Sequence, residues 1–316
     1  MKTRIIAVAG PTASGKTSLA IEIAKRVGGE VISNDSMQIY RGMEIGTAAP
    51  TTEEMQGVPH HMVGIIDPTE EFSCADYAVR ARSVIDDVAG RGRIPVFCGG
   101  TGLYLDSVLS VSDMSESGKD ESVRDRLAAF AEEKGACALH ERLRAVDPES
   151  ADAIHMNNVR RVIRALEIFE TTGVTKTEWD RRSKQRELPY DVSMAIIEFA
   201  DREALYSRID RRVHVMMKLG LLDEARELFE KGLLCRDKPA FQAIGYKELI
   251  PYFEGEASLE DCIAAIQLSS RRYAKRQITW FRRYEDAVRI VADRDGLVRS
   301  TEELCEEFFE KINNAN

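Results

Sequence analysis

The sequence has no hydrophobic run that approaches the ~18 apolar residues of a membrane-spanning helix. The first strand-like run begins by Arg4, and no segment resembling a signal peptide precedes it. The six cysteines are scattered and form no CxxC pair, which argues against a zinc site or a disulfide framework and favours reduced thiols. We therefore expect a cytoplasmic protein that has no membrane partner.

Aromatic residues are few, at 7%, and basic residues are outnumbered, since 44 Lys and Arg stand against 53 Asp and Glu for a net charge of −9. This balance argues against nucleic-acid binding over the whole surface but allows a local basic groove. At 316 residues with 44% hydrophobic content, the chain can form one large domain or two with a packed core, so global disorder is excluded.

Short apolar runs alternate with segments of helical spacing. The first run, 4–9 (RIIAVA), predicts a buried parallel strand. Apolar residues then recur at helical spacing at Leu19, Ala20, Ile23, Ala24 and Val27. Further strands are predicted at 31–33, 62–66, 94–98, 194–199 and 288–291. The alternation predicts an α/β fold with a doubly wound parallel sheet.

The alternation stops in the middle of the chain. The polar, Ser-rich stretch 110–122 predicts a linker, and 124–178 shows helical periods without a convincing strand. We expect an all-helical insertion at 117–189 within a core formed by 1–116 and 190–316. After Phe199 the core is mainly helical, with Asp201 and Ser258 as N-cap residues. A last strand at 288–291 and a terminal helix at 302–312 complete it.

A complete phosphate-loop motif, GxxxxGK[ST], lies between the first predicted strand and the first helix. Its glycines let backbone N–H groups converge on phosphate oxygens, and the following helix N-terminus adds positive potential. Lys16 supplies a charge, and Thr17 can ligate Mg²⁺. The predicted diphosphate-binding residues are Gly10, Pro11, Thr12, Ala13, Ser14, Gly15, Lys16 and Thr17.

A nucleotide such as ATP is the default ligand of such a loop, yet the parts of a hydrolase are missing. The sequence has no NKxD motif, and no apolar run ends in the acidic residue of a Walker B strand. Asp35 follows the second predicted strand, where strand ends line the ligand crevice. It could ligate Mg²⁺, abstract a proton from a nucleophile, or form only an Asx turn or helix cap.

Six blocks together resemble the bacterial tRNA dimethylallyltransferases, the IPP transferase family, over nearly the whole chain. The blocks are GPTASGKTSLA, SNDSMQIYRGMEIGTA, VPHHMVGIIDP, GRIPVFCGGTGLY, PAFQAIGYKEL and AKRQITWFRR. The resemblance implies transfer of a dimethylallyl group from its diphosphate to the exocyclic amine of the adenosine 3′ of the anticodon. It also implies why the hydrolysis parts are missing, because the loop holds a prenyl diphosphate whose diphosphate is the leaving group.

The family match also implies roles for single residues. Arg212 would be a further diphosphate clamp, Asp35 the base that assists the amine, and Thr101 a hydrogen-bonding partner in the same pocket. Ser36, Met37 and Gln38 would lie beside an adenine taken out of the stacked anticodon loop. The chain departs from the usual family pattern at Ala49 and in 155–158 (HMNN), which affects tRNA contacts more than the chemistry.

Basic residues are clustered in spite of the acidic total. The segment 271–283 carries six basic residues and no acid, and smaller basic clusters occupy 160–164 and 181–186. We expect a divided surface that meets a tRNA anticodon stem-loop, with Mg²⁺ as cofactor and the protein as a monomer. With Asp35, Ser36, Met37, Gln38 and Thr101, the predicted tRNA-binding residues are Arg124, Arg160, Arg161, Arg164, Gln242, Gly245, Lys247, Lys275, Arg276, Trp280 and Arg282.

Three alternatives stay open at this point. A small-molecule kinase would bind ATP in the loop and use Asp35 to activate a hydroxyl. An adenine-nucleotide isopentenyltransferase would need neither the insertion nor the basic C-terminal helix. A non-enzymatic RNA-binding regulator would bind without turnover. His60 and His61 have no third ligand at a recognisable spacing, which favours a structural role over a metal site.

Overall fold

The computed structural model describes residues 2–109, 120–185, 189–236, 238–294 and 296–315. Its contacts divide the chain into two compact units, one formed by 1–108 with 190–316 and the other by 109–189. The predicted boundary at 116/117 and most of the predicted linker 110–122 lie outside the described residues. No described helix is both long and apolar enough to cross a membrane.

The first unit is built on a six-stranded sheet in the order β3-β2-β4-β1-β5-β6, in which every neighbouring pair is parallel. Apolar side chains of the central strands are buried on both faces of the sheet, as a parallel sheet requires. The strands are β1 (Thr3–Ala9), β2 (Glu30–Ser33), β3 (His60–His61), β4 (Pro95–Gly99), β5 (Tyr190–Glu198) and β6 (Val288–Val291). The predicted α/β parallel sheet is therefore confirmed.

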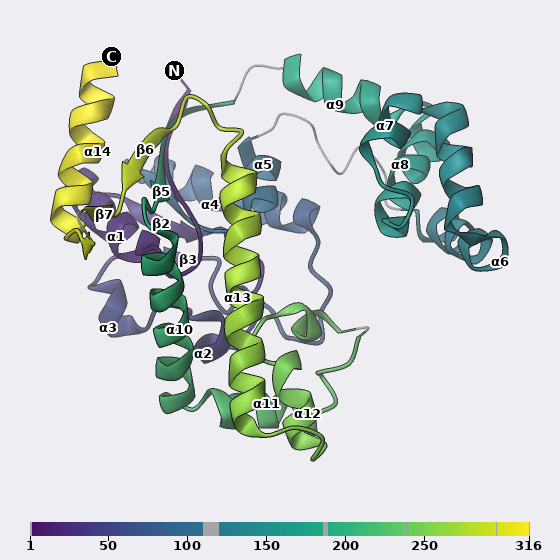
Figure 1. Ribbon diagram of the computed structural model, residues 1–316. Coiled ribbons are helices and arrows are strands. Elements are labelled where there is room, and N and C mark those ends of the chain that lie inside the picture. The colour runs from purple at the N-terminus through teal and green to yellow at the C-terminus, as the bar shows by residue number, and fades with distance from the viewer. Residues whose placement is uncertain (1, 110–119, 186–188, 237, 295, 316) are drawn as a thin grey trace. The chain divides into compact units, whose positions relative to one another are not determined.

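Helices cover both faces of this sheet (Figure 1). Helix α1 (Lys16–Val27) and helix α14 (Thr301–Ala315) share one hydrophobic core with alternate strand residues such as Val8 and Val96. Helix α4 (Cys74–Gly90) lies on the other face, where the Tyr77 hydroxyl donates to the Ser33 carbonyl (2.9 Å). Helices α10 (Arg202–Lys218) and α13 (Leu259–Phe281) pack against each other through Ile209 and Ala274.

The remaining helices of this unit are shorter. They are α2 (Glu44–Thr47), α3 (Thr52–Met55), α5 (Gly102–Leu109), α11 (Leu221–Glu230) and α12 (Ile250–Phe253), with 3₁₀ turns at Pro239–Gln242 and Lys247–Leu249. The predicted cap at Asp201 is confirmed, since its side chain accepts from the Glu203 N–H, and Ser258 likewise accepts from the Asp261 N–H. Helix α13 ends at Phe281.

The predicted strand at 62–66 is wrong. The edge strand β3 is His60–His61, and Met62 and Gly64 both have positive φ (63° and 59°), which breaks an extended run. Only an isolated bridge between Tyr40 and Ile66 remains of it. A short antiparallel pair that the pattern did not predict, β7 (Asp293–Arg294) and β8 (Leu297–Val298), follows the last strand of the sheet.

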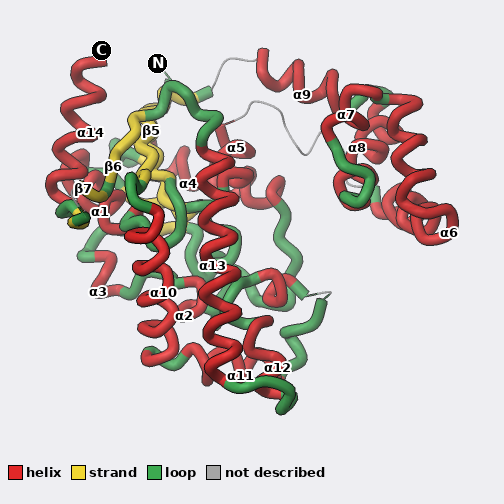
Figure 2. Tube along the Cα trace, in the orientation of Figure 1, coloured by secondary structure: helices red, strands yellow, loops and turns green. Residues whose placement is uncertain are grey.

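The described residues of the second unit form helices joined by loops and turns, with no strand among them (Figure 2). Its helices are α6 (Glu121–Val146), α7 (Pro148–Ala153), α8 (Val159–Thr172) and α9 (Lys176–Gln185). The apolar stripe of α8 packs against α6 in a separate small core that includes Val162, Leu166, Leu139 and Leu143. Gly135, with φ 86°, interrupts α6. The helical periods read from 124–178 therefore give the observed helices.

The register of the sheet brings three loops to one edge. Ala9 pairs with Gly99, and Ser33 pairs with Cys98, so β1, β2 and β4 all end at the same level. The segments that follow them are the phosphate loop, the Asn34–Tyr40 segment and the glycine-rich turn before α5. Residues far apart in the sequence thus meet at the carboxyl ends of parallel strands.

Candidate active site

The phosphate loop adopts a conformation that its residues do not favour on their own. Gly15 lies in the left-handed region with φ 92°, and Ala13 does so with φ 61° in spite of its side chain. A Cβ atom at Gly10 would lie 3.0 Å from the Ile197 carbonyl oxygen, so only glycine fits there without a shift. The fold thus holds the loop in a curved conformation that is suited to an anion.

Several donors of this loop have no hydrogen-bond partner among the residues that the structure describes. Gly15 is the N-cap of α1 and supplies no side chain, so the first N–H groups of the helix have no side-chain cap. The Ser14 hydroxyl, in a residue that is 2% exposed, is one of the donors without such a partner. Buried polar groups normally find a partner, so this set is suited to receive one from outside, namely an anion.

Cations surround the loop, and no described carboxylate forms an ion pair with them. The Lys16 ammonium donates to the Pro11 carbonyl (3.2 Å), and the Arg208 guanidinium on α10 donates to the Ala13 carbonyl (2.8 Å). Burial lowers the pKa of Lys16 from its ordinary value, and the nearby charge of Arg212 lowers it further. Burial also lowers the pKa of Arg212. These mutually repelling charges would be stabilised by a bound polyanion.

Asp35 forms the Asx turn that the sequence left open. Its Oδ1 accepts from the Met37 N–H (2.9 Å) and, at longer range, from the Gln38 N–H (3.4 Å). No described residue forms an ion pair with this carboxylate. The turn fixes the carboxylate beside the phosphate loop through Oδ1, so the Oδ2 atom is available to accept a hydrogen bond or a proton from a ligand.

Thr101 joins the glycine-rich turn to the same segment. Its Oγ1 accepts from the Ser36 N–H (3.1 Å) and lies 3.3 Å from the Ser36 hydroxyl, while its own N–H donates to the Asn34 carbonyl (3.2 Å). Thr101 and Asp35 are therefore parts of one hydrogen-bonded unit. The Gln38 amide is occupied on both sides, because it accepts from Ser33 and donates to the Thr47 and Ala48 carbonyls.

Two cavities meet at this site. The larger, which we call the loop cavity, has a volume of about 550 Å³ and is lined by Lys16, Thr17, Arg208 and Arg211 among others. The smaller, the Asp35 cavity, has about 290 Å³ and is lined by Asp35, Ser36 and Met37 together with Gln242, Gly245, Lys247, Tyr273 and Arg276. Arg212 and Met216 line both. The two cavities therefore adjoin at these two side chains, and Arg212 is available to a ligand in either one.

The basic residues of α13 and the turn after it fall into two groups. Arg271 forms an ion pair with Asp210 on α10 (2.6 Å), and Arg283 forms one with Asp106 on α5. Arg272, Lys275, Arg276 and Arg282 are exposed. Trp280 packs against Gly102, where a Cβ atom would come within 2.1 Å of the indole, and Arg283 covers its ring at 4.2 Å. The indole is thus partly covered by this chain, and its buried Nε1 has no hydrogen-bond partner among the described residues.

The predicted tRNA-binding arginines of the helical unit differ in whether they form ion pairs. Arg124 and Arg164 both pair with Glu167 at 2.8 Å, and Glu167 is fully buried. Arg160 and Arg161 are exposed on α8. In the third basic cluster, Arg181 and Arg182 pair with Glu178 (both 2.8 Å), whereas Arg186 lies outside the described residues.

Two residues of the site were missed by sequence reasoning. Arg208 lies one helical turn before Arg212, and that spacing along the α10 face could have indicated it. Gln277 on α13 accepts from the Thr12 N–H (2.8 Å) and donates to the Gly100 carbonyl (3.1 Å). Nothing in the sequence signals this contact, since its partners lie far away along the chain.

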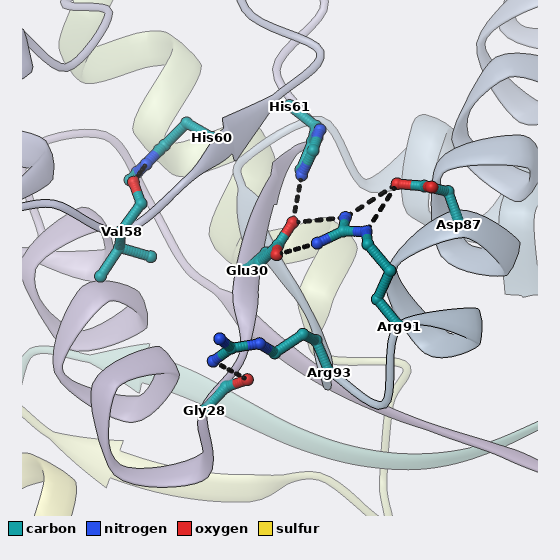
Figure 3. Close-up of polar contacts among 8 residues, drawn as sticks. All are labelled: Gly28, Glu30, Val58, His60, His61, Asp87, Arg91 and Arg93. Atoms are coloured by element: carbon teal, nitrogen blue, oxygen red, sulfur yellow. Dashed lines mark hydrogen bonds and ion pairs between the residues drawn. The ribbon is translucent and has the colours of Figure 1, made fainter.

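The two histidines take part in structural contacts at the far end of β2 (Figure 3). His61 Nε2 lies 2.8 Å from Glu30, which also binds Arg91, and the His60 Nδ1 lies 2.8 Å from the Val58 carbonyl. Among the described residues, no group of three or more His, Cys, Asp and Glu side chains could hold a metal ion.

Comparison with known proteins agrees with this geometry. The family model described as IPP transferase matches residues 38–284, and the isopentenyl transferase model matches residues 3–64. The tRNA dimethylallyltransferase of Geobacillus thermodenitrificans is 51% identical over 282 residues, which are 89% of this chain and 88% of that protein.

Solved structures agree as well. The full-length tRNA isopentenylpyrophosphate transferase of Bacillus halodurans is 43% identical, with a TM-score of 0.70 over 99% of both chains. A eukaryotic dimethylallyltransferase acting on tRNA is 32% identical, with a TM-score of 0.78 over 88% of this chain and 70% of that one. The resemblance read from the six blocks is thus confirmed, and the chain belongs to the IPP transferase family.

Proposed function

We propose that this enzyme transfers a dimethylallyl group from dimethylallyl diphosphate to the exocyclic amine of the adenosine immediately 3′ of the anticodon in tRNA, releasing diphosphate. The observation that carries the proposal is the pair of cavities that share Arg212 and Met216. The loop cavity is lined by donors of the phosphate loop, which we call the anion cradle. The Asp35 cavity is lined by the Asp35 carboxylate and by Lys247 and Arg276, which we call the basic wall. The names of the relatives given above state that they act on tRNA, and this supports tRNA as the substrate class of this enzyme.

The loop cavity is suited to the leaving group. Cleavage of the allylic C–O bond leaves a diphosphate with more negative charge than it had in the ester, so catalysis needs donors aimed at that charge. The uncapped N–H groups at the start of α1, Lys16 and Arg212 supply them. No described carboxylate forms an ion pair with Lys16 or Arg212, so their charges are available to the diphosphate.

A magnesium ion fits this cavity. Mg²⁺ prefers oxygen ligands and keeps several of its waters, so one hydroxyl and the diphosphate oxygens suffice to hold it. Thr17 lines the loop cavity at the start of α1 and would supply that hydroxyl. The ion would neutralise charge on the departing diphosphate.

The Asp35 cavity is suited to the acceptor. The amine of adenine is a weak nucleophile because its lone pair is delocalised into the ring, and it gains acidity as the new C–N bond forms. Asp35 would take the proton through Oδ2, while its Oδ1 stays in the turn. Thr101, bonded to the neighbouring Ser36, would position the amine. An adenine that enters this cavity must first leave the stacked anticodon loop, as happens in other enzymes that modify nucleobases.

The basic wall is suited to the RNA backbone. Arg276 and Lys247 line the Asp35 cavity, and Lys275 and Arg282 are exposed near it on α13 and the turn after it. Arg160 and Arg161 would add contacts from the helical insertion, which we take as 117–189. Arg124 and Arg164 would act mainly by holding Glu167 in place. We take the working enzyme to be a cytoplasmic monomer.

The direct test uses dimethylallyl diphosphate, Mg²⁺ and unmodified tRNA, followed by mass spectrometry of the digested nucleosides. The expected result is a prenylated adenosine at the position 3′ of the anticodon and an equal amount of released diphosphate. Parallel reactions contain adenine nucleotides in place of tRNA, or ATP in place of the prenyl diphosphate. Prenylation of free nucleotides alone, or ATP turnover with unmodified RNA, would contradict the proposal.

A further inference from the structure

Gln277 connects the two halves of the site through one buried amide. It lies on α13, is 4% exposed, accepts from the Thr12 N–H (2.8 Å) and donates to the Gly100 carbonyl (3.1 Å). Thr12 belongs to the phosphate loop, and Gly100 precedes Thr101. The amide therefore spans the distance between the anion cradle and the turn that positions the acceptor.

The contact requires glycine at position 100. A Cβ atom there would lie 1.9 Å from the Gln277 Nε2, closer than any real contact. The donor and acceptor of the amide are both used, so the side chain has one orientation. A contact this close, with both ends satisfied, fixes the relative position of the loop and the turn.

The same contact orients the loop. Because the Thr12 N–H donates to Gln277, it is turned away from the anion, and the cradle is left to the donors from Ser14 onward. Without the amide, this N–H would lack its partner, and the loop would lose its tie to α13.

Helix α13 also carries the surface proposed for RNA. Tyr273 and Arg276, in the helical turn that leads to Gln277, line the Asp35 cavity, and Lys275 is exposed. The helix that would bear the RNA backbone is thus the one that holds both loops.

We propose that Gln277 is a positioning residue that aligns the phosphate loop with the Thr101 turn, so that the prenyl diphosphate and the acceptor amine meet in reactive geometry. The assignment rests on the proposed function. It concerns alignment and not affinity, because Gln277 is in the lining of neither the loop cavity nor the Asp35 cavity.

The test compares Gln277→Met, which keeps the length of the side chain but removes its donor and acceptor, with Gln267→Met on the same helix. Gln267 contacts α10 through Asp210 and His214 and lies outside the site. The measurements are kcat and KM for both substrates and calorimetric binding of inorganic pyrophosphate without tRNA. Thermal unfolding of each variant is recorded in parallel.

We expect Gln277→Met to lower kcat on the order of 100-fold, the size expected when reacting groups are misplaced by about 1 Å. Pyrophosphate affinity and both KM values should stay within a few-fold of the unmodified enzyme, and Gln267→Met should match that enzyme throughout. Gly100→Ala breaks the same contact from the other side, so the double variant should be no slower than the slower single variant.

The proposal would be overturned by an unchanged kcat in Gln277→Met. It would also be overturned if kcat, pyrophosphate affinity and thermal stability fell together, because Gln277 would then only support the fold. Multiplying effects of Gln277→Met and Gly100→Ala would refute the shared contact. The prenylation assay of the unmodified enzyme comes before any variant is compared. If it yields no prenylated adenosine, the proposed function fails, separately from the role of Gln277.

Discussion

The two ends of strand β2 carry polar clusters of opposite design. At its first residue, Glu30 is bound by Arg91 and His61, and Arg91 also reaches Asp87 (2.8 Å), so every charge has a partner (Figure 3). Just beyond its last residue, Asp35 lies near Lys16 and Arg212, yet the described residues give none of the three an ion pair. The same strand thus ends in matched charge on one side and in unmatched charge on the other.

The difference separates structural from functional polarity. A matched cluster has satisfied its electrostatics within the chain, so it can stabilise the fold but offers little to a ligand. Cations without ion pairs, an uncapped helix start and a buried hydroxyl without a partner lower the free energy of unfolding. A bound anion would offset this loss of stability. Each prediction below changes one member of these clusters and asks whether chemistry or stability responds.

The largest effect is expected for Asp35→Asn. The amide oxygen can still accept from the Met37 N–H, so the Asx turn remains while the base is lost. We expect transfer to fall by about 10²–10⁴-fold, the usual contribution of a positioned base, with pyrophosphate affinity nearly unchanged. Single-turnover prenylation of tRNA measures the loss.

The matched control for this change is Asp67→Asn. Asp67 forms a similar turn, in which its Oδ1 accepts from the Thr69 N–H (2.9 Å), away from both cavities. It should leave transfer unchanged. A full rate in Asp35→Asn would remove the base from the mechanism, and an equal loss in both variants would point to turn geometry in place of proton transfer.

The next effect is expected for Arg212→Met. This change removes the one cation that lines both cavities but keeps an apolar side chain of similar length. Since loss of one donor to a developing anion costs about 10²–10³-fold, we expect kcat to fall by that amount and pyrophosphate binding to weaken. Arg202→Met, an exposed position on the same helix, should change neither, and unaltered pyrophosphate affinity in Arg212→Met would contradict the clamp.

The sequence predicted the unmatched end of β2 better than the matched end. The phosphate loop, Asp35 and the glycine-rich turn each depend on neighbours within one segment, so their spacing carries the signal. Gln277 and Thr12 are 265 residues apart, and Glu30 and Arg91 are 61 apart. Such contacts exist only once the sheet and helices are assembled, and single-sequence patterns do not contain them.

The wrong strand at 62–66 has a comparable cause. Its apolar composition was read correctly, since Met62 and Ile66 are both buried. The backbone at Met62 and Gly64 is left-handed, which composition cannot reveal. Composition also cannot reveal that Arg124 and Arg164 both pair with the buried Glu167. Their contact with tRNA stays a prediction.

At the matched end, Glu30→Gln should affect stability and leave the chemistry intact. Glu30 has a 6% exposed side chain, while Arg91 is 45% exposed and can be hydrated when its partner is neutralised. We expect the free energy of unfolding to fall by about 2 kcal/mol, less than for a fully buried pair. Urea denaturation measures this, and kcat should stay within twofold of the unmodified enzyme. A large loss of kcat without loss of stability would break the distinction drawn between the two ends.

The pH dependence follows from the same carboxylate. Its hydrogen bonds to Arg91, stronger in effect than its own burial, lower the pKa of Glu30 from 4.5 to about 2. A lowered carboxyl pKa contributes stability that is present above pH 4.5 and is lost as the pH falls towards 2. The stability difference between the unmodified protein and Glu30→Gln should therefore shrink across that window. A constant difference would contradict the assignment.

The smallest effect is expected on α13, where the same comparison recurs within one helix. Arg271 is matched by Asp210, whereas Lys275 is exposed and has no ion pair among the described residues. If Lys275 contacts an RNA phosphate, Lys275→Met should raise the dissociation constant for tRNA a few-fold. In a plot of the logarithm of this constant against the logarithm of the salt concentration, the slope should decrease by about 1. Arg271→Met should leave that slope unchanged, because its charge is already neutralised and only a modest cost in stability is expected. Binding titrations of both variants over a range of salt concentrations decide between these outcomes: equal slopes would mean that unmatched charge on this helix does not mark the RNA surface.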